Sequence, residues 1–115
     1  MICGGVVTLS VRDVAASIRF YVETLGMKFV EGNETEFAIV DAGNGFRIGL
    51  ERAPQRKPAS EVVFHTKMPL EEAVAILENR GVTVNPKGSR PGVWFKDPDE
   101  HVLYLWTAPT SQSEA

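Results

Sequence analysis

The sequence predicts an α+β fold made of two βαβββ modules within one domain of 115 residues. Three observations indicate this fold. A strand, a helix and a glycine stop follow one another in residues 6–27, a similar order recurs from residue 61, and a constant offset of 55 residues relates the two copies. A chain of this length suits one domain with a hydrophobic core, so the two copies are read as halves of a single domain.

The first copy opens with the clearest local pattern in the chain. Apolar and polar residues alternate in residues 7–11, which is typical of a strand with two different faces. Asp13 follows at the position of a helix N-cap, where its carboxylate can accept from free backbone N–H groups. Gly26 ends the helix, because glycine adopts the left-handed conformation without steric cost. The apolar stripe of this helix is Val14, Ile18, Tyr21, Val22 and Leu25.

The second copy repeats this order with the same spacing. Gly26 and Gly81 both follow helix-like runs and lie 55 residues apart. At other positions too, residues that lie 55 apart in the sequence are both apolar, which indicates an internal repeat. The matched pairs are Leu9 with Phe64, Met27 with Val82, Phe29 with Val84, Ile48 with Leu103, and Leu50 with Leu105.

Turn signals divide the rest of the chain. Asn44-Gly45 is typical of a tight hairpin turn, Pro69 suits the first turn of a helix, and a Pro-rich basic segment separates the copies. The apolar stripe of the second helix is Leu70, Ala73, Val74, Ile76 and Leu77. We expect repeat one at 6–51 (strands 6–11, 28–31, 36–40 and 46–51), a linker at 52–60, repeat two at 61–106 (strands 61–66, 82–84, 93–96 and 102–106), and a frayed tail at 107–115.

Composition narrows the classes of partner and compartment. The net charge of −3 disfavours a nucleic-acid partner, because phosphate binding needs clustered Lys and Arg. Cys3 is the single cysteine, so an intrachain disulfide is excluded, and we expect its thiol to be inert. The chain shows neither a membrane-length apolar run nor a signal-peptide pattern. We therefore expect a cytoplasmic protein without a membrane partner.

Two stretches resemble the vicinal-oxygen-chelate superfamily, the group of glyoxalases, bleomycin-resistance proteins and extradiol dioxygenases. They are VTLSVRDVAASIRFYVETLGM near the start and WFKDPDEHVLYLW near the end. The family commonly has Asp-Pro-Asp-Gly-Asn before its last strand, whereas this chain continues Asp97-Pro98-Asp99 with Glu100 and His101. The resemblance implies mixed sheets that curl around a cup, completed in a homodimer.

The resemblance also implies where a metal would bind. Enzymes of the family hold a divalent metal with side chains from four strand positions, which correspond here to Val6, Gly49, Glu61 and Tyr104. Val6 and Gly49 carry no ligand atom, and a neutral phenol is a poor ligand for a hard cation. Glu61 alone remains, whereas a catalytic metal normally takes three protein ligands. We predict neither a metal nor a cofactor.

The two histidines do not change this prediction. His65 follows Glu61 by four residues on one strand, so the two stand about 13 Å apart at ~3.3 Å per residue. One ion cannot bind both directly. His101 lies in a turn, where we expect it to be solvated.

Strand alternation predicts which side chains line the cup. The opposite side of the strands carries a consistent helix-packed core of Val7, Leu9, Val11, Ile48, Leu50, Val62, Phe64, Leu103 and Leu105, with Phe95 also on this side. Aromatic walls with a few charged groups suit a planar or amphipathic organic ligand. A dimer interface is the alternative role for Trp94 and Trp106, because interfaces are also rich in aromatics. The predicted ligand-binding residues are Arg47, Glu61, Val63, His65, Trp94, Lys96, Tyr104 and Trp106.

These expectations favour a metal-free binding protein of the bleomycin-resistance type, which sequesters an aromatic or cationic compound without turnover. The alternative is an enzyme of the same fold. That enzyme is either a metal-dependent lyase, isomerase, dioxygenase or thiol transferase, or a metal-free acid–base enzyme that uses Glu61. Glu61 could equally be a salt-bridged strand carboxylate, for example with Arg47. A third reading is an interaction or regulatory module whose cup is closed. We assign no catalytic residue.

Overall fold

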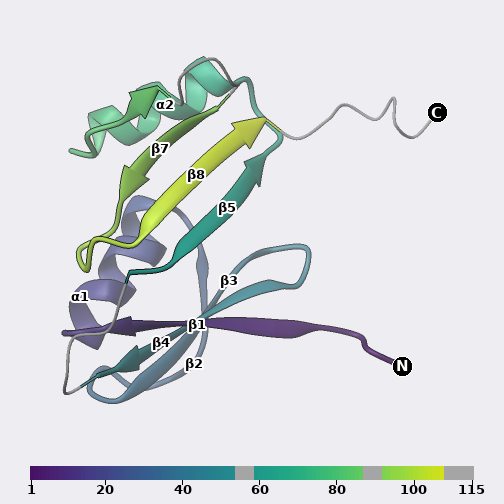
Figure 1. Ribbon diagram of the computed structural model, residues 1–115, viewed down its shortest axis with the longest axis vertical. Helices are drawn as coiled ribbons and strands as arrows, with labels where there is room; N and C mark the ends of the chain where they lie inside the picture. The colour runs from purple at the N-terminus through teal and green to yellow at the C-terminus, as the bar shows by residue number, and fades with distance from the viewer. Residues whose placement is uncertain (54–58, 87–91, 108–115) are drawn as a thin grey trace. The chain divides into compact units, whose positions relative to one another are not determined.

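The computed structural model describes residues 1–53, 59–86 and 92–107, and these form two compact units (Figure 1). The first unit comprises Met1–Ser60 together with Asp97–His101, and the second comprises Glu61–Lys96 and Val102–Ala115. Each unit has its own four-stranded mixed sheet, as the predicted pair of βαβββ modules requires. No helix in the described part of the chain is long and apolar enough to cross a membrane.

The sheet of the first unit has the strand order β1-β4-β3-β2. Its outer strand β1 pairs in parallel with β4, and the other neighbours are antiparallel. The helix α1 packs against β3 and β4. The bounds are β1 Gly5–Val11, α1 Val14–Ile18, β2 Lys28–Gly32, β3 Phe37–Gly43 and β4 Phe46–Arg52.

The first helix begins and ends where the sequence predicts, but its second half is wider than an α-helix. Asp13 caps it by accepting from the N–H of Ala16 at 3.1 Å, and Gly26 adopts a φ of +79°. Residues Arg19–Thr24 form a π-helix, in which the N–H of Leu25 donates to the carbonyl of Phe20. Periodicity alone cannot separate π from α turns, because a single wide turn shifts the apolar stripe only slightly.

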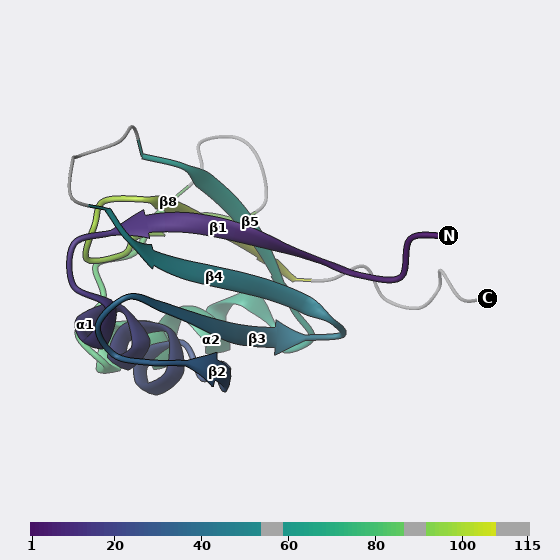
Figure 2. The same ribbon diagram turned by 90° about the horizontal axis from the view of Figure 1, so that it is seen from below.

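The core of the first unit follows the predicted alternation. Leu9, Val11, Ile48 and Leu50 are buried on the helix side of the sheet. Val7 shares that side but is 44% exposed, so its predicted place in the core is wrong. Figure 2 gives the reason, because the N-terminal half of β1 runs past α1.

The predicted hairpin turn between β3 and β4 is confirmed. Asn44 and Gly45 both have positive φ, at 54° and 78°, as a tight hairpin turn requires. The side chain of Asp41 accepts from the N–H of Gly43 at 2.6 Å and so fixes the entry to the turn. These contacts extend β3 to Gly43, beyond the strand end expected at residue 40.

The second unit repeats the plan with a shorter outer strand. Its sheet has the order β5-β8-β7-β6, with β5 and β8 parallel. The strand expected at residues 82–84 is wrong, since Val82 and Val84 are half-buried outside the ladder and pairing begins only at Asn85. The bounds are β5 Glu61–Thr66, α2 Leu70–Asn79, β6 Asn85–Pro86, β7 Val93–Lys96 and β8 Val102–Thr107.

The second helix is placed correctly, with one error in its buried stripe. It begins directly after Pro69, and Gly81 follows it with a φ of +89°. Ala73 and Leu77 form the buried face, while Ile76 is 38% exposed, contrary to prediction. The expected linker at 52–60 and tail at 107–115 fall largely on residues 54–58 and 108–115, which lie outside the described residues.

Strand register confirms that the two modules repeat each other. In the first sheet Thr8 pairs with Gly49, and in the second Val63 pairs with Tyr104. Adding 55 to either residue of the first pair gives its counterpart in the second. The parallel strands of both sheets therefore share one register, and the same sequence position faces the same way in each.

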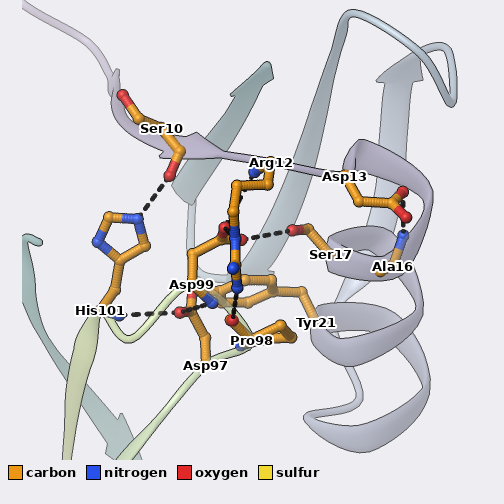
Figure 3. Close-up of polar contacts among 10 residues, drawn as sticks. All are labelled: Ser10, Arg12, Asp13, Ala16, Ser17, Tyr21, Asp97, Pro98, Asp99 and His101. Carbon is orange, nitrogen blue, oxygen red and sulfur yellow. Dashed lines mark hydrogen bonds and ion pairs between the residues drawn. The ribbon is translucent and has the colours of Figure 1, made fainter. Parts of the chain in front are cut away.

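A turn from the second half of the sequence completes the first unit. Residues Asp97–His101 join β7 to β8 along the chain, yet they belong to the first unit (Figure 3). The Tyr21 hydroxyl donates to Asp97 Oδ2 at 2.6 Å. The other oxygen of Asp97 accepts from the N–H groups of Asp99 and His101, each at 2.9 Å. One buried carboxylate thus fixes the turn internally and ties it to the first helix.

Asp99 holds the same turn to the end of β1. Its Oδ1 accepts from both the backbone N–H and the Nε of Arg12, each at 2.9 Å, and an Arg12 terminal nitrogen donates to the Pro98 carbonyl at 2.7 Å. The Ser17 hydroxyl lies 3.5 Å from the other Asp99 oxygen. The Asp99 side chain is almost buried, whereas the Arg12 side chain is 71% exposed, so solvent still screens this ion pair from one side.

His101 is buried at 2% exposure, so the expectation that it is solvated is wrong. Its Nδ1 accepts from the N–H of Ser60 at 2.8 Å, and its Nε2 lies 2.7 Å from the Ser10 carbonyl, which can only accept. The imidazole is therefore the neutral tautomer with hydrogen on Nε2. A turn sequence gives no sign of this burial, because the partners lie 91 and 41 residues away.

Burial sets the ionisation of the Tyr21–Asp97 pair. Desolvation raises the pKa of the Asp97 carboxyl above its usual value, although its hydrogen bonds from Tyr21, Asp99 and His101 oppose that rise. Burial beside this carboxylate also raises the pKa of Tyr21, which stays a neutral donor. A raised folded-state pKa means that the stability tied to Asp97 is fully present at low pH and is lost as the pH rises through that pKa.

Tyr21→Phe tests this pair. Loss of the hydroxyl removes a donor that lowers the pKa of Asp97, so that pKa rises further and more stability is lost on ionisation. We expect the variant to be destabilised by about 1.5–3 kcal/mol at pH 7, as for a hydrogen bond to a charged group. The destabilisation should be smaller near pH ~3.5, where the carboxyl is protonated. Urea unfolding of both proteins across this pH range measures it, and a pH-independent difference would contradict the assignment.

Candidate functional site

The second sheet has one side covered by apolar packing and one side that carries most of the predicted ligand-binding residues. Val62, Phe64 and Leu103 are buried on the covered side. We call the opposite side the open face. Strand register places eight side chains on it, namely Glu61, Val63, His65, Trp94, Lys96, Val102, Tyr104 and Trp106. Seven of the eight predicted ligand-binding residues are among them, and all of those seven are exposed or half-buried.

Backbone pairing arranges this face in three rows across the strands. Val63 pairs with Tyr104, which pairs with Trp94, so two aromatic side chains and a valine form the central row. A charged row lies on one side of it, because Glu61 and Lys96 both pair with Val102. His65 pairs with Trp106 on the other side. Neighbouring strands lie about 4.8 Å apart, so each row is a contiguous surface.

Trp106 is held in place from two directions. Its ring stacks on His65 with centroids 6.0 Å apart and planes at 29°. A Cβ added to Gly92 would lie 2.5 Å from Trp106 Cδ1, so the indole packs against the glycine backbone. Gly92 also has a φ of +116°, a conformation that other residues rarely adopt. Gly92 is thus a supporting residue that the sequence reasoning missed, although a glycine directly before a strand is a usable signal.

Arg47, the eighth predicted residue, belongs to the first unit. It lies on β4, and its Nε is 3.4 Å from Asp41 Oδ2 on β3, with which it is directly paired. Its described carboxylate partner is therefore Asp41. The placement of Arg47 in a ligand site stays a prediction.

Two of the four positions that the resemblance assigns to metal ligands, Val6 and Gly49, carry no ligand atom. A Cβ at Gly49 would lie 3.2 Å from Phe37 Cε1 and 3.0 Å from Thr8 Oγ1, so the phenyl ring occupies the space that a ligand side chain would need. Val6 offers no donor atom. Within residues 1–53, 59–86 and 92–107, no group of three or more His, Cys, Asp or Glu is placed to hold a metal ion.

The buried 97–101 turn is not a second candidate site. The carboxyl of Asp97 and the imidazole of His101 each make two or more hydrogen bonds inside the first unit. A general acid or base must reach a substrate proton, and these groups are 5% and 2% exposed. Their role is to hold the turn, and the open face remains the candidate site.

Comparison with known proteins places this geometry in a family. The model of the Glyoxalase/Bleomycin resistance protein/Dioxygenase superfamily matches residues 5–105. No curated protein sequence matches the chain.

Solved structures share the fold over nearly the whole chain. A member of the same superfamily from Sphaerobacter thermophilus DSM 20745 is 27% identical, with a TM-score of 0.77 and coverage of 94% of this chain and 98% of that one. The antibiotic-binding protein TnmS3 from Streptomyces sp. CB03234 is 24% identical, with a TM-score of 0.79 and coverage of 95% and 98%. The bleomycin-binding protein of Streptomyces verticillus, solved with copper(II)-bleomycin, is 21% identical, with a TM-score of 0.71 and coverage of 95% and 98%.

Proposed function

The chain belongs to the glyoxalase/bleomycin resistance protein/dioxygenase superfamily, and on that premise we propose that it binds a small organic molecule on the open face of the second sheet without a metal. The ligand is an aromatic or cationic compound, and it is sequestered rather than converted. The observation that carries this proposal is the half-buried aromatic row of Tyr104 and Trp94, beside the His65–Trp106 stack.

Aromatic side chains at this position are suited to binding. Tyr and Trp offer large rigid surfaces with two rotatable side-chain angles, so little conformational entropy is lost when a ligand covers them. Trp94 and Tyr104 are half-buried, and each keeps area that a ligand could remove from water. Neither ring belongs to the buried core, which lies on the other side of the sheet.

The similar structures support the same class of function. TnmS3 is described as an antibiotic-binding protein, and the Streptomyces verticillus protein was solved with copper(II)-bleomycin. Both have this fold across more than nine-tenths of the chain. Two proteins that share this fold are thus described as binding antibiotics, which supports a small organic molecule as the ligand here.

The metal-free part of the proposal rests on the donor set. Of the family's four metal positions only Glu61 carries a good ligand for a hard cation, and the phenyl ring of Phe37 fills the space beside Gly49. Acid–base catalysis by Glu61 is the competing function within the family. Glu61 is exposed at the start of β5, whereas a carboxylate tuned for proton transfer usually sits in a water-excluded pocket.

We also propose that the protein is a homodimer that covers the N-terminal half of β1. This strand is at the edge of its sheet, so one side of its backbone is unpaired within the unit. Val6 and Val7 are each 44% exposed on it. Edge strands with exposed apolar residues are liable to pair with another chain, and natural proteins usually cover them.

The ligand-binding proposal is tested by a small-molecule screen that follows tryptophan fluorescence, since both tryptophans lie on the open face. For a compound found in this way, Trp94→Ala should weaken binding by about 1–3 kcal/mol, as for an aromatic anchor. Tyr104→Phe should cost about 0.5–1.5 kcal/mol, the worth of one neutral hydrogen bond. Isothermal titration of each variant measures both.

The controls separate binding from folding, metal and turnover. Ile76→Ala, on the exposed side of α2, should leave affinity unchanged. EDTA should also leave it unchanged, and chromatography should recover the compound intact. If Trp94→Ala unfolds the protein but the folded fraction binds normally, Trp94 is a core or interface residue and the proposal fails. Affinity lost on chelation, or conversion of the compound, would favour an enzyme.

The dimer is tested by sedimentation velocity at micromolar concentration. We expect a species of about twice the chain mass of 12.6 kDa. Val6→Glu should shift it toward monomer, because a buried unpaired charge opposes association. Phe29→Glu is the matched control, since Phe29 is 43% exposed on β2, at the opposite edge of the same sheet. A wild-type protein that sediments as a monomer would contradict the proposal.

A further inference from the structure

The charged row of the open face carries opposite charges at its two ends. Glu61 on β5 and Lys96 on β7 both pair with Val102 on the strand between them, and both are exposed. Each backbone lies one strand spacing from β8, so the two positions are about 9.6 Å apart at ~4.8 Å per strand. A carboxylate and an ammonium therefore flank one valine on the same side of the sheet.

The aromatic row runs parallel to this charged row. Trp94 precedes Lys96 by two residues on β7, and Tyr104 follows Val102 by two residues on β8. At ~3.3 Å per residue the rows are about 6.6 Å apart, so one small molecule can cover both. Val102 offers an apolar floor for a ring, with the aromatic side chains along one edge of it.

We propose that the ligand of this face is an aromatic zwitterion with a cationic group at one end of its core and an anionic group at the other. The ring lies over Val102 beside Trp94 and Tyr104, the cation faces Glu61, and the anion faces Lys96. This inference rests on the proposed ligand-binding function and narrows its ligand class.

Charge complementarity favours a zwitterion over a ligand of one sign. A purely cationic aromatic compound is attracted by Glu61 but repelled by Lys96. A purely anionic one is attracted by Lys96 but repelled by Glu61. A zwitterion of matching length gains at both ends. Each exposed charge pair is worth up to about 1 kcal/mol, which corresponds to about a fivefold change in affinity.

The test uses three matched probes and the full-length protein. 4-(Aminomethyl)phenylacetate is the zwitterion, 4-methylbenzylamine carries only the cation, and 4-methylphenylacetate carries only the anion. Quenching of tryptophan fluorescence measures their affinities. We expect the zwitterion to bind about 3–5-fold more tightly than either singly charged probe at low salt, with the preference shrinking as salt is added.

Charge-altering variants assign the two ends. Glu61→Gln should weaken binding of the zwitterion and the cation about 3–5-fold and should not weaken binding of the anion, from which it removes a repulsion. Lys96→Met should weaken binding of the zwitterion and the anion and should not weaken binding of the cation. The double swap Glu61→Lys with Lys96→Glu should restore zwitterion binding, because the probe can reverse its direction. Glu71→Gln and Lys28→Met are controls for net charge, since both residues are exposed and lie on α2 and β2 rather than on the strands of the open face.

The possible outcomes distinguish failure of the zwitterionic ligand class from failure of ligand binding on the open face. The proposal of a zwitterionic ligand would be contradicted if all three probes bound with equal affinity, or if substitution of residues 61 and 96 left their affinities unchanged. Either result would still leave the aromatic row as a binding site. Failure of every probe, with a screened compound that depends on Trp94 but carries one sign of charge, would also overturn it. If no compound in the screen responds to Trp94→Ala, the proposed function itself fails.

Discussion

The buried carboxylate of Asp97 is the contact on which the arrangement of the first unit depends. It accepts one hydrogen bond from Tyr21 on the first helix and two from N–H groups of its own turn, while Asp99 and His101 attach that turn to β1 and Ser60. Removal of a single partner would leave a buried polar group unsatisfied, which costs more than the hydrogen bond contributes when it is formed. The first unit is therefore complete only when residues from the second half of the sequence have been supplied.

The open face of the second sheet results from the alternation of side chains along its strands. Alternation sends Phe64 and Leu103 into the core and leaves their neighbours Val63 and Tyr104 on the other side. In the first sheet the equivalent positions are Thr8 and Gly49, where the phenyl ring of Phe37 takes the available space. One register thus gives two different surfaces, because the second module carries the adjacent aromatic residues Tyr104 and Trp94 at its outward positions, whereas Thr8 and Gly49 lie beside the single ring of Phe37 in the first. This asymmetry is why the candidate site is assigned to one sheet.

Sequence reasoning succeeded where a residue's role is local. Asp13 as an N-cap and Asn44-Gly45 as a hairpin turn depend only on the adjacent backbone, and strand alternation alone predicts which residues share the open face. Sequence reasoning failed where contacts with distant segments determine whether a side chain is buried or supported. The burial of His101 comes from Ser10 and Ser60, and the support of Trp106 by Gly92 depends on how a loop approaches a strand. The π turns after α1 also leave no periodic signal distinct from an α-helix.

Amide chemical shifts measured during ligand titration test most directly whether the open face of the second sheet binds a small organic ligand. With 15N-labelled protein and a compound from the fluorescence screen, we predict that the largest shifts fall on β5, β7 and β8, around Val63, Trp94 and Tyr104. The indole N–H of Trp94 should shift with the same affinity. Shifts confined to the exposed face of α2 or to β2, with the open-face amides unmoved, would contradict binding at the open face.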